Sequence, residues 1–149
     1  MHVRALLDAP VPAEALFAWV GDLARYPSWL DIVRSADPLP VAGTVDDLPA
    51  WDVVLQARVG PFRRSKALRM VRSGVEEDRW ARFERREADG RHHARWSLEA
   101  HLEPEGDGTR LVMDLRYDGA LWSPPLEYLL HHQIERGKPR LASLAGGRP

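Results

Sequence analysis

The chain has 149 residues, 44% hydrophobic and 29% charged, with a formal net charge of −1. This length predicts one domain that buries about 70% of the surface its unfolded chain exposes. The absence of cysteine excludes disulfides and thiolate metal sites, and the near-neutral charge argues against nucleic-acid binding. No apolar run reaches the ~18 residues of a membrane span, and no signal-peptide core follows the first residues. We therefore expect a soluble, cytoplasmic protein, monomeric or homodimeric, with one domain over 1–149 and a disordered tail at 146–149.

The N-terminal part of the chain predicts one strand followed by two short helices. Residues 2–9 alternate loosely between apolar and polar side chains, as a strand does. A helix is expected from Pro12 to about residue 22 or 23, because four apolar side chains recur at i, i+3, i+4 and i+7: Leu16, Trp19, Val20 and Leu23. Pro27 should break it, since the residue before a proline avoids the helical region, and a second helix is expected over 29–33.

From about residue 34 the helical period vanishes and hairpins follow one another. A weak strand and a proline-rich loop over 38–49 come first. The alternation then predicts strands at 51–59, 63–72, 79–87, 94–102 and 111–117. Turns are expected at residues 73–74, 89–90 and 106–108, which contain glycine.

The last predicted element is a long helix that begins at Ser123. Its apolar stripe consists of Leu126, Leu130, Ile134, Leu141 and Leu144, and Pro139 should kink it near Arg136. An antiparallel sheet with one apolar face must cover that face, and only this helix is long enough to do so. The sequence therefore predicts an α+β fold, in which a curved antiparallel sheet of six to seven strands wraps around the C-terminal helix.

Several short motifs occur in order along nearly the whole chain. They are the small-residue helix Pro12–Asp22, Tyr26-Pro27-Ser28-Trp29, Trp96-Ser97-Leu98, Gly108-Thr109-Arg110 and Tyr117-Asp118-Gly119. Their order and spacing resemble the SRPBCC superfamily, the START-like and birch-pollen-allergen-like proteins that include polyketide cyclases. The resemblance implies the helix-grip fold and a cavity for a hydrophobic or amphipathic molecule. It does not imply catalysis, because some members are enzymes and others only bind or transfer a ligand.

The candidate ligand-binding residues are apolar and aromatic side chains expected on the inner face of the sheet and on the final helix. They are Trp51, Val53, Leu55, Leu68, Met70, Phe83, Trp96, Leu98, Met113, Tyr117, Leu130 and Ile134. Ordinary core packing is the competing interpretation of each. Tyr117 is the best polar candidate, because a phenol among apolar groups needs a partner, and the thioethers of Met70 and Met113 suit a loosely shaped pocket.

A basic cluster extends from Arg58 to Arg72. Paired with acidic residues across strands, it would form a solvated face of the sheet; alternatively, one cation holds an anionic ligand group or the cluster contacts an acidic partner. If Leu68 and Met70 point inward, Lys66 does so too and Arg69 points outward. A shift of one residue would place Arg69 in the cavity instead.

No pattern predicts a metal, cofactor or catalytic residue. The pairs His92-His93 and His131-His132 cannot each chelate one ion, because adjacent side chains diverge on a strand or a helix. No serine lies in a Gly-x-Ser-x-Gly elbow, and the glycines at 106 and 108 fit a hairpin turn rather than a phosphate loop.

The sequence thus predicts a protein that binds a hydrophobic or amphipathic small molecule, such as a lipid, a polyketide or a quinone-like compound, between sheet and final helix. The alternative is a polyketide cyclase/aromatase-type enzyme that acts on a poly-ketone chain through cavity shape and polar Tyr or Arg groups; a third is an interaction module. The ligand is expected to enter between the 38–49 loop and helix residues 126–138, because Gly137 and Pro139 weaken that helix.

Overall fold

A computed structural model describes residues 1–40, 47–119 and 123–147. In chain order its elements are β1 (His2–Ala9), α1 (Ala13–Val20), the 3-10 helix η1 (Leu23–Ser28), β2 (Val33–Pro38), β3 (Ala50–Val59), β4 (Phe62–Glu76), β5 (Trp80–Arg85), β6 (Trp96–Glu105), β7 (Gly108–Tyr117) and α2 (Ser123–Ala145). Of the expected tail at 146–149, residues 146–147 form a turn after α2, and 148–149 lie outside the described residues.

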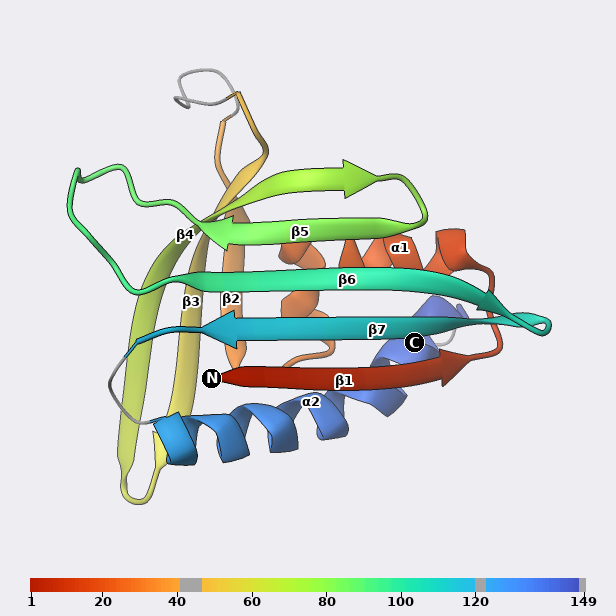
Figure 1. Ribbon diagram of the computed structural model, residues 1–149. Helices are drawn as coiled ribbons and strands as arrows, with labels where there is room; N and C mark the ends of the chain where they lie inside the picture. The colour runs from red at the N-terminus through yellow and green to blue at the C-terminus, as the bar shows by residue number, and fades with distance from the viewer. Residues whose placement is uncertain (41–46, 120–122, 148–149) are drawn as a thin grey trace.

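The seven strands form one antiparallel sheet in the order β1-β7-β6-β5-β4-β3-β2. Each strand from β2 to β7 pairs with its neighbour in the chain, and β1 pairs along β7, with Val3 opposite Leu115. The sheet is strongly curved, and α2 runs beneath it on the side where α1 and η1 also lie (Figure 1). This confirms the α+β architecture expected from the sequence, at seven strands.

The second short helix lies earlier in the chain than expected. It is the 3-10 helix η1, which contains Pro27, whereas residues 29–33 form no helix. The Asp22 carboxylate accepts a hydrogen bond from the Ala24 amide (3.0 Å) and so caps η1. The helix expected over 29–33 was wrong because this cap starts a new helical turn soon after α1, and η1 ends at Ser28.

β4 continues through the expected turn at residues 73–74. Its register with β5 shifts between Arg72 and Gly74, and a Cβ at Gly74 would lie 2.6 Å from the Trp80 ring. Gly74 therefore makes room for a cross-strand indole within an irregular strand pair. The chain turns only at 77–79, where Asp78 has φ +63.

α2 runs without interruption from Ser123 to Ala145, Pro139 included. Gly137 faces the chain before β2: a Cβ there would lie 2.4 Å from the Trp29 carbonyl oxygen and 3.1 Å from its ring. The glycine thus allows close approach between α2 and the segment after η1. A role as a weak point of the helix is not needed to explain it.

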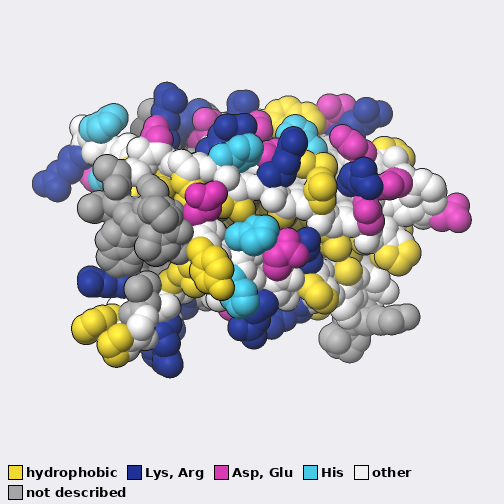
Figure 2. Space-filling model, turned by 60° about the horizontal axis from the view of Figure 1, so that its bottom comes forward, with side chains coloured by type: hydrophobic (Ala, Val, Ile, Leu, Met, Phe, Trp, Pro, Cys, Tyr) yellow, Lys and Arg dark blue, Asp and Glu magenta, His cyan; other side chains and the backbone are white. Residues whose placement is uncertain are grey.

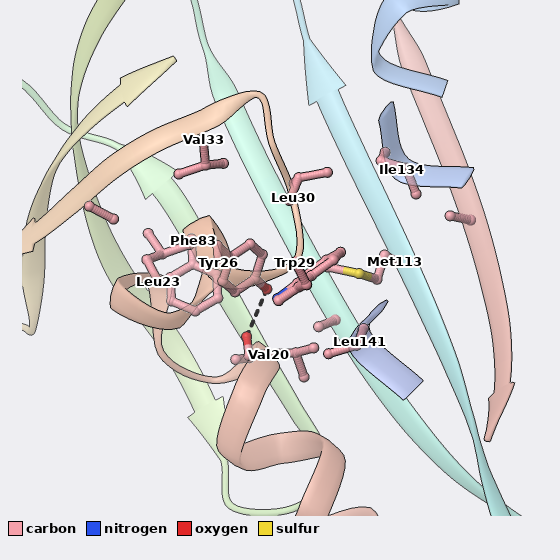
Figure 3. Close-up of a cluster of buried hydrophobic side chains, with 14 of the residues drawn as sticks. Val20, Leu23, Tyr26, Trp29, Leu30, Val33, Phe83, Met113, Ile134 and Leu141 are labelled. Carbon is pink, nitrogen blue, oxygen red and sulfur yellow. Dashed lines mark hydrogen bonds between the residues drawn. The ribbon is translucent and has the colours of Figure 1, made fainter. Parts of the chain in front are cut away.

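The core lies between the inner face of the sheet and the three helices. Leu141 of α2, Leu16 of α1 and Phe83 of β5 are fully buried in it. Tyr26 and Trp29 pack against each other with ring centroids 5.0 Å apart, and Tyr26 meets Phe83 edge-on at 6.3 Å. Figure 3 shows this cluster, with Tyr26 and Trp29 at its centre.

Candidate functional site

An apolar pocket of about 80 Å³ lies within the core, between the inner face of the sheet, η1 with the segment after it, and α2. We call it the central pocket. Its lining residues are Val3, Leu23, Tyr26, Trp29, Leu30, Ile32, Val33, Ala36, Val53, Leu55, Leu68, Met70, Trp96, Leu98, Met113, Leu115, Leu130 and Ile134. Most of them are buried, whereas Leu55, Leu98 and Leu115 are half-buried. Leu98 and Leu115 face each other across β6 and β7, near the carboxyl end of β7.

Tyr26 carries the one ionisable group among these lining residues. Its hydroxyl donates a hydrogen bond to the Val20 carbonyl oxygen at 2.8 Å (Figure 3). Burial raises the pKa of this phenol well above its ordinary value, and the nearby Asp22 charge adds to the effect. Tyr26 is therefore a neutral structural donor that ties η1 to the end of α1.

Two tryptophans are among the residues that line the central pocket. The indole N–H groups of Trp29 and Trp96 are buried, and neither has a hydrogen-bond partner. Trp96 lies on β6, where it stacks on Tyr117 with ring centroids 4.4 Å apart. Trp29 follows η1 directly and lies between Tyr26 and the sheet residue Met113 in Figure 3.

Nine of the twelve candidate residues line the central pocket. They are Val53, Leu55, Leu68, Met70, Trp96, Leu98, Met113, Leu130 and Ile134. They come from β3, β4, β6, β7 and α2, whose alternating or helical patterns are regular. The structure thus brings them together at one place; whether they contact a ligand stays a prediction.

The other three candidates are buried outside the lining. Trp51 and Phe83 pack edge-on against each other, with centroids 5.6 Å apart, and fill the core beside the pocket. Tyr117 lies beneath the Trp96 ring at the end of β7, and a Cβ on Gly119 would collide with its hydroxyl group. Tyr117 is not among the residues that line the pocket.

Nine lining residues were missed by the sequence interpretation. They are Val3, Leu23, Tyr26, Trp29, Leu30, Ile32, Val33, Ala36 and Leu115. Seven of these belong to the stretch 23–36, which passes through η1 and an irregular segment and shows no single period. Its density of large apolar residues was the available signal. Val3 and Leu115 are opposite each other in the β1–β7 pair and follow the inward alternation.

The register of β4 is settled by burial. Leu68 and Met70 are buried, Lys66 is exposed, and Arg69 is half-buried with its guanidinium donating to the Arg86 carbonyl oxygen (2.9 Å). Neither Lys66 nor Arg69 lines the pocket, although Lys66 lies opposite the lining residue Leu55 in the β3–β4 pair. The inward cation of this strand is Arg72, which donates to the Gly21 carbonyl oxygen at the end of α1 (2.9 Å).

A second, polar hollow of about 490 Å³ lies between the start of β1 and α2. His2, Arg4, Glu127, Tyr128 and His131 line it, and Val3 belongs to both hollows. Figure 2 shows the face with α2, where histidine, acidic and hydrophobic side chains lie side by side. We call this hollow the polar groove.

Asp114 supports the strand side of the polar groove. Its carboxylate lies 2.7 Å from the His2 ring nitrogen and 3.2 Å from the Arg4 guanidinium. Burial alone would raise the pKa of this carboxyl, but the hydrogen bond from His2 and the Arg4 charge outweigh it. The pKa of Asp114 is therefore lowered from its ordinary value.

Over the described parts of the chain, no three His, Asp or Glu side chains come close enough to hold a metal ion. Within the same residues no helix has the length and apolar character needed to cross a bilayer. The expected entrance beside the 38–49 loop falls partly on 41–46, outside the described residues. The half-buried lining residues Leu98 and Leu115 lie nearer the carboxyl end of β7.

Comparison with solved structures gives the same fold at low sequence identity. The protein TTHA0849 from Thermus thermophilus is 21% identical with a TM-score of 0.69, over 99% of this chain and 98% of that one. A START superfamily protein from Mycobacterium smegmatis is 18% identical with a TM-score of 0.68, over 98% and 97%. Ara h 8.0201 is 14% identical with a TM-score of 0.63, over 99% of both chains.

At the level of sequence, no curated protein matches the chain. Residues 9–143, however, match the family model described as "Polyketide cyclase / dehydrase and lipid transport". This match spans every element from the end of β1 to the last turns of α2. With the helix-grip fold shared by the START and Ara h 8 structures, it shows that the chain belongs to the polyketide cyclase/dehydrase and lipid transport family of the SRPBCC superfamily.

Proposed function

We propose that the protein binds a hydrophobic small molecule in the central pocket, between the sheet and α2. The observation that carries the proposal is the pocket itself: a hollow within the core that is lined by aliphatic, aromatic and thioether side chains. Natural interiors are close-packed, and an apolar hollow of this kind accepts apolar molecules readily. Membership in a family that includes lipid transport supports this use of the hollow.

The small volume of the pocket means either that the ligand is small or that lining side chains move apart when it binds. About 80 Å³ is well below the roughly 300–1,000 Å³ of pockets for drug-sized ligands. A lipid or polyketide would therefore have to move lining side chains apart. Met70 and Met113 are suited to this, since their unbranched thioethers adapt to changed shapes. An amphipathic ligand could extend its polar end past Val3 into the polar groove.

Catalytic cyclisation is the weaker alternative. It needs a group that moves a proton or holds an enolate at the reacting atoms. Among the described lining residues Tyr26 has the one ionisable side chain, and its hydroxyl already donates to the Val20 carbonyl oxygen. The predicted polar candidates Tyr117, Lys66 and Arg69 lie outside the lining. The described lining residues therefore fit ligand binding better than they fit catalytic cyclisation.

A fluorescence titration with N-phenyl-1-naphthylamine, a neutral apolar probe, tests the proposal. We expect saturable enhancement at one probe per chain. Val53→Phe should weaken probe binding at least tenfold, because the added ring occupies the pocket. Val54→Phe is the matched control on the opposite face of β3, where the side chain is half-buried and outside the lining.

Two results would contradict the proposal: no saturable binding, or equal loss of affinity in both variants. Thermal unfolding of each variant checks its fold, since overpacking costs about 1–3 kcal/mol. If Val53→Phe does not fold, Ala36→Leu provides a smaller obstruction on β2 with the same expected loss.

A further inference from the structure

The β3–β4 hairpin projects from the sheet as a two-stranded arm. β2 pairs with β3 only as far as Leu55, and β5 pairs with β4 only from Met70 onward. Residues 57–66 lie between these limits and pair with each other but with no other described strand; we call them the basic arm. Figure 1 shows the turn of this hairpin at the bottom of the view, beyond the other strands and past the start of α2. The arm is therefore open to solvent over most of its length.

The basic arm carries four cations and no carboxylate. Arg58, Arg63, Arg64 and Lys66 are exposed, and no Asp or Glu occurs between residues 53 and 75. This concentration is local, because the whole chain has a formal net charge of −1. Arg58 and Arg63 lie directly opposite each other in the hairpin. Like charges at opposite positions destabilise a strand pair, so the stability of the hairpin does not account for this arrangement.

The cations of the arm differ from those of another hairpin in the same sheet. In the β6–β7 hairpin, Arg110 contacts the Glu105 carboxylate at 2.9 Å. In the basic arm, Arg58, Arg63 and Lys66 form no ion pair with any described residue. Cross-strand pairing with acidic residues, one interpretation of the basic cluster, therefore does not apply to these three side chains. Their positive charge is available to a partner.

The end of the basic arm is apolar. Gly60 and Pro61 form the turn, and Phe62 directly after it is 62% exposed. A phenyl ring this exposed gains little from the fold. Because side chains alternate along a strand, Arg63 and Arg64 project to opposite faces of the arm. The arm thus presents an apolar end with cations behind it on both faces.

We propose that the basic arm docks the protein on a lipid bilayer that contains anionic phospholipids, with Phe62 inserted at the interface and the four cations at the level of the headgroups. Anionic lipids attract clustered Lys and Arg side chains, and an inserted aromatic ring adds apolar burial. Successive strand residues rise about 3.3 Å, so Lys66 lies about 13 Å behind Phe62 along the strand. Long cationic side chains reach the headgroups from these positions. The proposal does not depend on what the central pocket binds.

A nucleic acid or an acidic protein would also attract the cations, but the apolar end favours a bilayer. Phosphates along a duplex are contacted by charged and polar groups, whereas the foremost side chain of the arm is Phe62. A folded acidic protein would need a pocket shaped for that ring. A bilayer accepts the ring without one and holds the cations at its surface.

Sedimentation of the full chain with sucrose-loaded vesicles tests the proposal. One set of vesicles is phosphatidylcholine alone, and the other contains equal parts of phosphatidylcholine and phosphatidylserine. We expect binding to the anionic vesicles to be tighter by about tenfold or more. Added sodium chloride should weaken this binding, because salt screens the attraction.

Arg58→Glu separates binding from folding. It places a carboxylate opposite Arg63, so the strand pair should gain stability while the arm loses positive charge. We expect binding to the anionic vesicles to weaken about tenfold or more. Arg91→Glu makes the same charge change at an exposed position between β5 and β6, and should weaken binding by less than about threefold. Phe62→Ser should weaken binding about 3- to 10-fold and leave its salt dependence in place.

A fluorescent label shows which part of the molecule enters the interface. The chain has no cysteine, so one introduced thiol carries one label. An NBD group on Phe62→Cys should brighten and shift to the blue when anionic vesicles are added. The same group on Asp107→Cys, in the exposed turn of the β6–β7 hairpin, should not respond.

Several results would overturn the proposal: no binding to anionic vesicles, equal weakening by Arg58→Glu and Arg91→Glu, or an equal response of the label at both turns. Duplex DNA that binds the wild-type protein but not Arg58→Glu, together with no vesicle binding, would assign the arm to nucleic acid instead. Each of these failures leaves ligand binding in the central pocket unaffected, because the N-phenyl-1-naphthylamine titration contains no vesicles.

Discussion

At the scale of single residues, the Tyr26 hydroxyl joins two segments that have no regular backbone pairing. It donates to the Val20 carbonyl oxygen from a side chain that is 1% exposed. Tyr26→Phe leaves that carbonyl without this donor, and we expect it to lower the free energy of unfolding by about 1 kcal/mol. Urea denaturation measures this change. Tyr128→Phe, at an exposed position, should change it by less than about 0.5 kcal/mol; equal effects would show that the Tyr26 bond contributes nothing.

The lowered pKa of Asp114 predicts that the free energy of unfolding depends on pH. Its pKa is lowered in the folded protein, so the unfolded chain binds the proton more readily. The stabilisation is therefore present above the ordinary carboxyl pKa of 3.8 and is lost as the pH falls through the lower folded value. Asp114→Asn should destabilise the protein by about 1 kcal/mol at pH 7, and the difference should shrink under acid.

Urea unfolding between pH 7 and pH 2.5 measures this prediction. Asp107→Asn, in the exposed turn between β6 and β7, is the control and should follow the wild-type curve. A difference between Asp114→Asn and wild type that stays constant across this range would contradict the role given to the Asp114 carboxylate.

At the scale of elements, the regular periodicity of the strands predicted which of their side chains point toward the core. The alternation in β3, β6 and β7 gave the inward residues Val53, Trp96 and Met113 correctly. The stretch 23–36 has no such period, because one short helix, a turn segment and the start of a strand share it. The directions of its side chains are set by packing against the sheet and not by a repeating local pattern. Local pattern therefore could not identify Tyr26 or Trp29 as pocket residues.

A substitution at Gly137 tests how closely α2 packs against residues 23–36. Alanine is favoured over glycine in a helix by about 1 kcal/mol, but a Cβ here would lie 2.4 Å from the Trp29 carbonyl oxygen. We expect Gly137→Ala to destabilise the protein by about 1–3 kcal/mol in thermal or urea unfolding. Arg136→Ala, exposed on the same helix turn, should be nearly neutral. Stabilisation by Gly137→Ala would show that the contact relaxes easily.

Ligand entry should involve α2, because Leu130 and Ile134 form its wall of the central pocket. Amide hydrogen exchange with and without N-phenyl-1-naphthylamine measures this. We expect added protection concentrated in residues 126–138, since a ligand in the pocket restrains local opening of the helix. Uniform protection, or protection confined to the central strands, would contradict an entrance beside α2.

At the scale of the whole molecule, the sequence predicted the architecture because each hairpin and the final helix carry their own signals. The pocket is different, since its volume depends on how far α2 and the 23–36 stretch approach the sheet. Close contacts such as Gly137 against Trp29 fix that separation. Periodicity contains no information on it, so the small volume of about 80 Å³ could not be predicted.

The most direct test of ligand binding between sheet and helix uses the three methionines of the chain. Met70 and Met113 line the central pocket, and Met1, outside the lining, serves as internal reference. In protein labelled with ¹³C at the methionine methyl groups, titration with N-phenyl-1-naphthylamine should shift the Met70 and Met113 resonances together, with one dissociation constant, and leave Met1 nearly unchanged. Shifts confined to Met1, or probe binding that leaves Met70 and Met113 unmoved, would contradict a ligand site in this pocket.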